Sequence, residues 1–216
     1  MITRYGYSTV TVITIISFLL ITIGILSNNN VLKFTLIIIA ILSMLFTLNF
    51  FRDPERKVPD EEDIIISPAD GKVLFVSEIN DERFLKGKAK QVAIFMSPLN
   101  VHVNRIPVSG KVEYLKYHPG EFIAAFEDKA SEKNERNEIG IESKHGKVLF
   151  VQIAGFIARR IVSELKIGDE VKIGERFGMI KFGSRVDVIV PPEWAEKVKK
   201  DDIVYAGETI LFKKNN

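Results

Sequence analysis

The sequence has no cysteine among its 216 residues, only three histidines and one tryptophan. Without cysteine the chain forms no disulfide, has no thiol nucleophile and offers no thiolate ligands for zinc or an iron–sulfur cluster. His102, His118 and His145 are therefore the few candidates for acid–base chemistry near neutral pH. Positive charge is not in excess either: the formal net charge is +2. Nothing in the composition indicates nucleic-acid binding.

The sequence does contain two long uncharged segments near its N-terminus, Val10 to Leu26 and Phe34 to Phe51. Each has about 17 or 18 residues, roughly 26 Å as a helix, which just spans the hydrocarbon core of a bilayer. A cleaved signal peptide would account for the first segment but not the second, and no A-x-A cleavage site follows. The short asparagine-rich connection indicates a helical hairpin, with a hairpin buried in a soluble protein as the alternative.

Basic residues flank the hairpin at both ends: Arg4, Arg52, Arg56 and Lys57. Because basic residues accumulate on the cytoplasmic side of membranes, both ends are expected to face the cytoplasm. The three that follow the second segment are each expected to contribute about 1 kcal/mol toward anionic lipid. Residues 1–52 are thus predicted to be a membrane anchor, and residues 53–216 a separate domain on the cytoplasmic side.

The second domain opens with a linker in which four consecutive acids, Asp60 to Asp63, mark a change in composition. Beyond it, β-like runs recur between turn signals at residues 72–79, 91–97, 111–117, 147–154 and 186–190. This spacing favours a mainly β barrel or sandwich over alternating strands and helices. Two short helices are expected as well, over residues 154–165 and 192–200.

A faint internal repeat relates Gly168–Arg176 to Asp201–Thr209, which share an Asp, a Val, a Gly and a Glu. Its turn looks like those of biotinyl- and lipoyl-type hybrid barrels, so the β domain is expected to have hybrid-barrel-like features. By fold analogy alone, a carrier or a membrane export adaptor is an alternative. Neither a Met-Lys-Met nor an Asp-Lys-Ala turn is present, so a carrier would lack its attachment lysine.

Gly183-Ser184 interrupts a strand pattern, because it lies directly before the alternating Val186, Val188 and Val190. Glycine in such a pattern commonly marks a β-bulge or a close approach of the backbone to another group. A bulge at the start of the strand is the simplest interpretation of these residues alone. A chemical role for the serine is the other.

Four further segments carry polar residues that suit either structure or chemistry. Asp70 lies in a Pro-Ala-Asp-Gly turn, where aspartate commonly bonds its own backbone. His102 lies in a Val-x-Val context typical of a structural histidine or of a base. The run "KASEKNERN", with Asn134 and Arg136, predicts either a solvated loop or a buried polar network or head-group site.

Arg159 and Arg160 are adjacent in an otherwise apolar segment. The planar guanidinium suits phosphate or carboxylate, and snorkelling toward lipid would serve equally well.

Taken in order, these segments resemble the phosphatidylserine decarboxylases in their short, membrane-anchored form. The matching stretches are the hairpin, "FFRDPER", "SPADGKV", "IFMSPLNVHVNRIPVSGKV", "KASEKNERN", "QIAGFIARRIV" and "IKFGSRVDVIVP". The most specific is "FGSR", which matches the Gly-Ser self-cleavage site of that family.

The resemblance implies a zymogen that cuts itself between Gly183 and Ser184 and converts Ser184 into a covalent pyruvoyl cofactor. Glycine tolerates the backbone geometry that exposes its carbonyl to the serine hydroxyl, and the attack needs a nearby base. The pyruvoyl group would then serve as electron sink where other decarboxylases use pyridoxal phosphate. The two cleaved chains are expected to remain associated, and no metal is implied.

The resemblance also assigns Asp70 and His102 to the active site. Asp70 would orient or polarise the base for self-cleavage, and His102 would act as general base or acid. Longer members of the family carry a second histidine three positions later, where this chain has Arg105. His102 would then serve both steps, or another group such as His118 would take one of them. His145 has the sequence context of a solvated turn residue.

The expected activity is decarboxylation of phosphatidylserine to phosphatidylethanolamine, a step of phospholipid biosynthesis, at the cytoplasmic face of the cell membrane. Substrate-binding candidates are Asn134, Arg136, Arg159 and Arg160. One alternative is a decarboxylase of archaeal ether lipids with a serine head group, and another is a non-enzymatic hybrid-barrel adaptor. The expected partners are the phospholipid and the membrane, without nucleic acid, and association into a homo-oligomer is left open.

Overall fold

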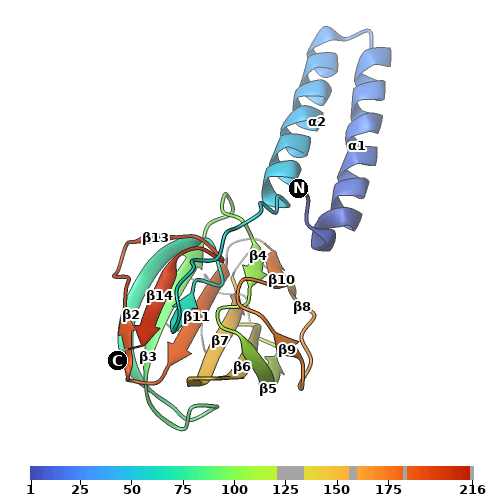
Figure 1. The fold of residues 1–216 in the computed structure, drawn as a ribbon. Coiled ribbons are helices and arrows are strands. Elements are labelled where there is room, and N and C mark those ends of the chain that lie inside the picture. The colour runs from blue at the N-terminus through green and yellow to red at the C-terminus, as the bar shows by residue number, and fades with distance from the viewer. Residues whose placement is uncertain (121–133, 156–159, 182–183, 215–216) are drawn as a thin grey trace. The chain divides into compact units, whose positions relative to one another are not determined.

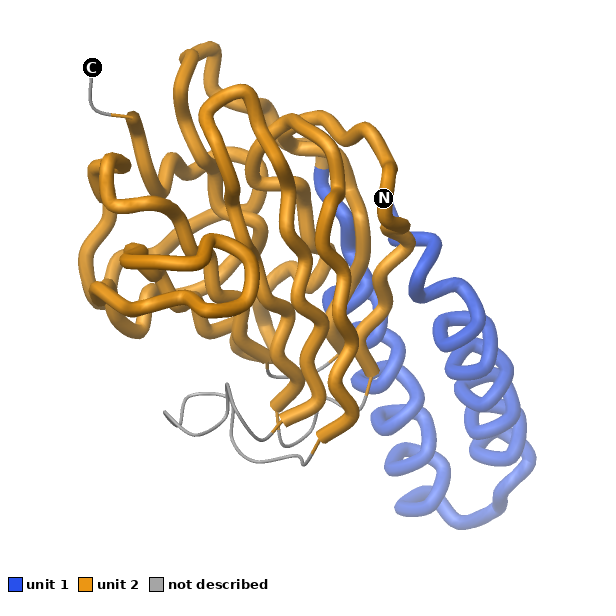
Figure 2. Tube along the Cα trace, turned by 90° about the horizontal axis from the view of Figure 1, so that it is seen from below, with its two compact units in different colours: residues 1–54 blue, residues 55–216 orange. Residues whose placement is uncertain are grey.

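The computed structural model describes residues 1–120, 134–155, 160–181 and 184–214. The chain forms two compact units, Met1–Pro54 and Glu55–Asn216 (Figure 2). Each unit is described separately below, and Gly183 and Arg159 lie outside the described residues.

The first unit is a pair of helices preceded by a short 3₁₀ turn, η1 (Arg4–Gly6). Helix α1 spans Tyr7–Leu26 and helix α2 spans Asn30–Phe50 (Figure 1). Asn29 caps α2, because its Oδ1 accepts the backbone N–H of Leu32 at 3.2 Å. Both helices are long and apolar enough to cross a membrane, and many of their large apolar side chains are exposed. The predicted helical hairpin is confirmed.

The second unit is mainly β, as predicted. Its strands are β1 (Ile64–Ile66), β2 (Gly71–Asp81), β3 (Gly87–Met96), β4 (Val103–Arg105), β5 (Gly110–His118), β6 (Arg136–Ser143), β7 (Gly146–Ala154), β8 (Arg160–Ser163), β9 (Glu170–Val171), β10 (Arg176–Lys181), β11 (Ser184–Val190), β12 (Trp194–Glu196), β13 (Ile203–Val204) and β14 (Ile210–Lys214).

Among the described residues, eight strands form one antiparallel sheet in the order β13-β2-β3-β11-β7-β6-β5-β9. Two sheets of three strands, β1-β14-β12 and β4-β10-β8, complete the unit (Figure 1). The large sheet is curled, and strand alternation gives it two faces with different cores. The inner face carries the main core, which includes Val186, Val188 and Phe150. The outer face carries a smaller cluster around Phe84, Leu149 and Ile189.

The internal repeat has a structural counterpart at the two edges of the large sheet. Strand β13 pairs with the Gly71-Lys72 start of β2, and β9 pairs with the Gly110-Lys111 start of β5. A Cβ atom on Gly71 would lie 2.2 Å from the Phe95 carbonyl oxygen, so only glycine fits there. Each repeat unit therefore contributes a two-residue strand that pairs with the start of a long strand, and that long strand begins with a glycine.

The two predicted short helices are wrong. Residues 160–163, which fall within the first, form strand β8, and β12 occupies the middle of the second. In both places pairing with β10 or β14 overrides the weak local helix preference. For the polar run "KASEKNERN", the two interpretations were a solvated loop and a buried polar network or head-group site, and its last two residues begin β6. Asn134 and Asn137 are buried there, so the described part of this run is not solvated.

Candidate active site

Ser184 is the first residue of β11 and is fully buried. It pairs with Met96 at the end of β3 on one side and with Ala154 at the end of β7 on the other. Both pairings continue along β11 without a register shift, so the described part of this strand contains no bulge. The bulge predicted at Gly183-Ser184 stays a prediction, because Gly183 lies outside the described residues.

The Ser184 hydroxyl donates a hydrogen bond to the sulfur of Met96 at 3.3 Å. A thioether is a weak acceptor, so this bond orients the hydroxyl without holding it strongly. Ser184 shares the inner face of the sheet with the apolar core, where water is excluded. The hydroxyl is thus buried, oriented and easily redirected toward another acceptor.

A chain of buried amide side chains leads away from this contact along the inner face. Asn104 Nδ2 lies 3.9 Å from the Met96 sulfur, and Gln152 Nε2 donates to Asn104 Oδ1 at 2.9 Å. Asn137 Nδ2 in turn donates to Gln152 Oε1 at 3.2 Å. These groups come from β4, β7 and β6, and they are polar but uncharged. A connected buried network of this kind makes the local arrangement specific and rigid.

His102 immediately precedes β4 and is fully buried. Its Nδ1 lies 3.0 Å from the carbonyl oxygen of Asn100. Because a carbonyl only accepts, this contact assigns the proton to Nδ1 and leaves Nε2 as the basic nitrogen of the neutral ring. His102 lies two residues before Asn104, whose amide lies 3.9 Å from the Met96 sulfur. The segment that carries His102 therefore leads toward Met96, which is the strand partner of Ser184.

Asp70 lies in the turn just before β2, and its carboxylate is buried. Oδ2 accepts from Arg56 Nη2 at 2.8 Å, and Oδ1 accepts the backbone N–H of Ala206 at 2.8 Å. Strand β2 is two strands from β11, about 10 Å across the sheet. Asp70 therefore lies at the same end of the sheet as Ser184. At this distance we expect it to act on the Ser184 hydroxyl through another side chain and not by direct contact.

The side chains of Asn134 and Arg136, both predicted to bind the substrate, contact different parts of the sheet. The Asn134 amide donates to the backbone oxygen of Ala154 at 2.7 Å, and Ala154 is the strand partner of Ser184. Asn134 thereby supports the backbone beside the serine. Arg136 points to the other face, where Nε donates to Glu138 at 3.3 Å and Nη2 lies 3.3 Å from His118 Nδ1.

The other histidines and Arg105 are not placed to replace His102. His118 lies with Glu138 on the outer face, 3.3 Å from its carboxylate, so the sheet separates it from the Ser184 hydroxyl. His145 forms an ion pair with Asp63 and is not simply solvated. Arg105 follows Asn104 in β4 and so points to the opposite side of that strand, where its Nη1 donates to the Gly174 carbonyl at 3.0 Å.

Arg160 and Lys181 place two cations side by side. They are register partners at the end of the β8–β10 pair, and Lys181 lies three residues before Ser184. Burial lowers the pKa of the Lys181 ammonium, and the neighbouring Arg160 guanidinium lowers it further. Like charges that face each other across two strands repel, so an anion bound between them would be stabilising.

The sequence interpretation missed several polar residues around the serine. Directly behind it on the outer face, Arg185 makes two bonds to Asp187, at 2.6 Å and 2.9 Å, and Gln91 adds a third at 2.7 Å. Burial raises the pKa of the Asp187 carboxyl, and Arg185 opposes that shift. The sequence did contain a signal for these groups, because Gln152 and Asp187 are polar residues within otherwise apolar strand segments. Nothing in the sequence linked Arg56 to Asp70.

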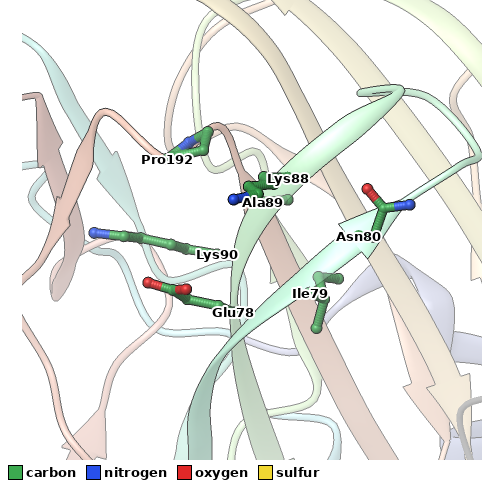
Figure 3. A pocket seen from close by; sticks show the side chains of 7 residues that line it. All are labelled: Glu78, Ile79, Asn80, Lys88, Ala89, Lys90 and Pro192. Atoms are coloured by element: carbon green, nitrogen blue, oxygen red, sulfur yellow. The ribbon is translucent and has the colours of Figure 1, made fainter.

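A pocket of about 500 Å³ lies away from this site, lined by Glu78, Ile79, Asn80, Lys88, Ala89, Lys90 and Pro192 (Figure 3). Its cation Lys90 is already engaged, since Nζ lies 2.8 Å from the Glu196 carboxylate and 3.0 Å from the Trp194 carbonyl oxygen. None of the predicted site residues lines it. The candidate active site is therefore the Ser184 end of the large sheet.

Comparison with known proteins gives consistent matches. The sequence profile of a family described as phosphatidylserine decarboxylase matches residues 44–212. A phosphatidylserine decarboxylase proenzyme from Chlorobium chlorochromatii (strain CaD3) is 48% identical over 213 residues, covering 98% of this chain and 99% of the relative. One from Carboxydothermus hydrogenoformans is 50% identical over 194 residues, covering 89% and 91%. One from Pelodictyon phaeoclathratiforme is 55% identical over 171 residues, covering 79% and 80%.

Proposed function

The chain belongs to the phosphatidylserine decarboxylase family, and from that premise we propose that it is a lyase that decarboxylates phosphatidylserine through a pyruvoyl group made from its own Ser184. The observation that supports this mechanism best is the position of Ser184, buried at the first residue of β11 with its hydroxyl held only by a thioether. The relatives' names support neither an ether-lipid decarboxylase nor a non-enzymatic adaptor.

In the proposed maturation, the Ser184 oxygen attacks the Gly183 carbonyl carbon while His102 Nε2 takes the hydroxyl proton. The C–N bond between the two residues breaks, the Ser184 nitrogen leaves as an amine, and an ester remains. Removal of the Ser184 α-proton then breaks the ester C–O bond, releasing Gly183 as a carboxylate and leaving dehydroalanine. Water adds to that residue and ammonia leaves, which gives the pyruvoyl group.

The surroundings of Ser184 fit such a group. Met96 and Ala154 are its strand partners on either side, and the Asn104 amide, which lies 3.9 Å from the Met96 sulfur, is neutral. When formed, the group supplies the electron sink for loss of carbon dioxide. The chain's own contribution is to bind and orient the head group, to exclude water, and to hold a proton at His102 for the carbon that loses carbon dioxide.

Intact mass spectrometry of the purified protein tests the maturation. We expect two chains, residues 1–183 and a piece that begins at the converted Ser184 and has a blocked N-terminus. The smaller piece should react with a carbonyl reagent, whereas a serine N-terminus produced by a contaminating protease would not. A single uncut chain with full decarboxylase activity would refute the proposal.

We place the head-group phosphate between Arg160 and Lys181, because an anion there relieves the repulsion of two adjacent cations close to Ser184. Arg159, which precedes Arg160 in the chain, stays a candidate for binding the substrate, and it lies outside the described residues. Arg136 is a poorer candidate, since Glu138 and His118 already engage it.

Substitution of Arg160 tests this placement. A hydrogen bond to a charged group is worth about 1.5–3 kcal/mol, so Arg160→Gln should raise KM for phosphatidylserine roughly tenfold or more. Self-cleavage should be unchanged, because the phosphate takes no part in it. Lys172→Gln, at an exposed position, is the control. An Arg160→Gln enzyme with unchanged KM would place the phosphate elsewhere.

We propose that the hairpin anchors the enzyme in the cell membrane with the catalytic unit on the cytoplasmic side. The exposed apolar surface of α1 and α2 supports insertion, and the flanking basic residues support the orientation. Arg56 is not among the cations offered to anionic lipid, because it is engaged in ion pairs with Asp70 and Glu208 of the catalytic unit.

Deleting residues 1–50 should leave a chain that still cleaves itself, since the candidate site lies within Glu55–Asn216. Activity on phosphatidylserine in bilayers should fall far more than activity on a short-chain soluble analogue, because the loss is in encounter with the lipid. Both activities are measured on the same preparation. Equal losses on the two substrates would mean that the hairpin supports the fold of the catalytic unit.

A further inference from the structure

Arg56 lies just after the hairpin, yet its guanidinium is partly buried within the catalytic unit. Nη2 lies 2.8 Å from Asp70 Oδ2 and Nη1 lies 2.9 Å from Glu208 Oε2. The exposed fraction of the Arg56 side chain is 13%, and that of Asp70 is 6%. The expectation that Arg56 faces anionic lipid is therefore wrong, because both of its terminal nitrogens already bind carboxylates.

The turn that holds Glu208 is shaped around this arginine. The Tyr205 ring centroid lies 5.6 Å from the guanidinium carbon, within the range of a cation–π contact. Gly207 has φ of +82°, and a Cβ there would lie 2.9 Å from Arg105 Cδ and 3.3 Å from Arg56 Cβ. The neighbouring Ala206 N–H is the group that binds the second oxygen of Asp70. One short turn thus contacts both members of the Arg56–Asp70 pair.

The pair is built to hold the carboxylate in one orientation. Asp70 Oδ2 is bound by Arg56 and Oδ1 by Ala206, so rotation of the carboxylate would break one or both bonds. A guanidinium binds two acceptors at once through its rigid fork, which a lysine ammonium cannot reproduce with the same geometry. A buried carboxylate also needs a paired cation to stay ionised.

We propose that Arg56 is a positioning residue for self-cleavage, which keeps Asp70 ionised and fixed so that it can support the base that activates Ser184. The linker after the membrane hairpin is then part of the maturation site and not merely a tether. This inference rests on the proposed role of Asp70 in self-cleavage, so its test must separate the two.

The test follows the time course of self-cleavage in the full-length chain, synthesised in the presence of detergent micelles and sampled on denaturing gels. Arg56→Met should cleave at least about tenfold more slowly, because Asp70 loses its buried partner. Lys172→Met removes an exposed cation of the same unit and should cleave at the wild-type rate. Arg56→Lys should be intermediate, since an ammonium restores the charge but not the fork.

Two readouts distinguish positioning from simple support of the fold. Added guanidinium ion, at concentrations that do not denature, should partly restore cleavage of an Arg56→Ala chain. The pH profile of cleavage should move upward in Arg56→Met, because a buried carboxylate that loses a neighbouring cation ionises at higher pH. A chain that is slow but shows neither rescue nor a shifted profile would overturn the proposal, as would wild-type cleavage in Arg56→Met.

Asp70→Asn separates the two hypotheses. If Asp70→Asn cleaves normally, the proposed role of Asp70 fails and the inference fails with it. If Asp70→Asn is slow while Arg56→Met cleaves at the wild-type rate, only the inference about Arg56 is overturned.

Discussion

Replacing Ser184 with alanine is expected to leave the purified protein as one uncut chain without decarboxylase activity. The hydroxyl is the only nucleophile of that residue, and without it neither the ester nor the pyruvoyl group forms. The fold should be nearly unaffected, because the substitution removes one hydrogen bond to a thioether, worth about 1 kcal/mol or less. Gel electrophoresis, intact mass and release of carbon dioxide from labelled phosphatidylserine measure the three results.

Ser184→Cys is the informative companion, since a thiol is also a nucleophile and should allow some cleavage where alanine allows none. Ser143→Ala serves as the control, because that hydroxyl bonds the Gly146 carbonyl in the β6–β7 turn, remote from the cleavage site. An alanine variant at position 184 that still decarboxylates the lipid would disprove the pyruvoyl mechanism.

His102→Gln and Asp70→Asn are expected to have the next largest effects. A general base contributes roughly 10²- to 10⁴-fold, so loss of the imidazole should abolish measurable turnover. Because His118 and Arg105 are engaged elsewhere, neither is placed to take over, and His102→Gln should slow self-cleavage as well. Asp70→Asn keeps the shape of the side chain but removes the charge that faces Arg56, so uncut precursor should accumulate.

His118→Gln is the matched control for the histidine, and it should cleave and decarboxylate normally. Thermal unfolding of each variant in a Ser184→Ala background compares stabilities without interference from cleavage. Full activity in His102→Gln or in Asp70→Asn would remove that residue from the active site.

Local patterns in the sequence were enough for several features of the protein. Two uncharged runs long enough to span a bilayer determined the helical hairpin, because an apolar helix needs no information beyond its length and composition. Alternation and turn residues determined most long strands, including β2, β3 and β7, since side-chain period and turn chemistry are local properties. The order of the motifs, with Gly-Ser before β11, was sufficient to indicate the family.

Tertiary structure decided which polar side chains meet. The Arg56–Asp70 pair, the chain from Asn137 through Gln152 to Asn104, and the outward direction of Arg136 all depend on strand order and register. Strand β8 formed where a helix was expected because pairing with β10 outweighs local propensity. A one-residue change of register turns a side chain to the opposite face of a sheet, and no short stretch of sequence contains that information. The sequence by itself therefore determined the hairpin, the long strands and the residue proposed to be cut, whereas long-range pairing selected the groups that surround it.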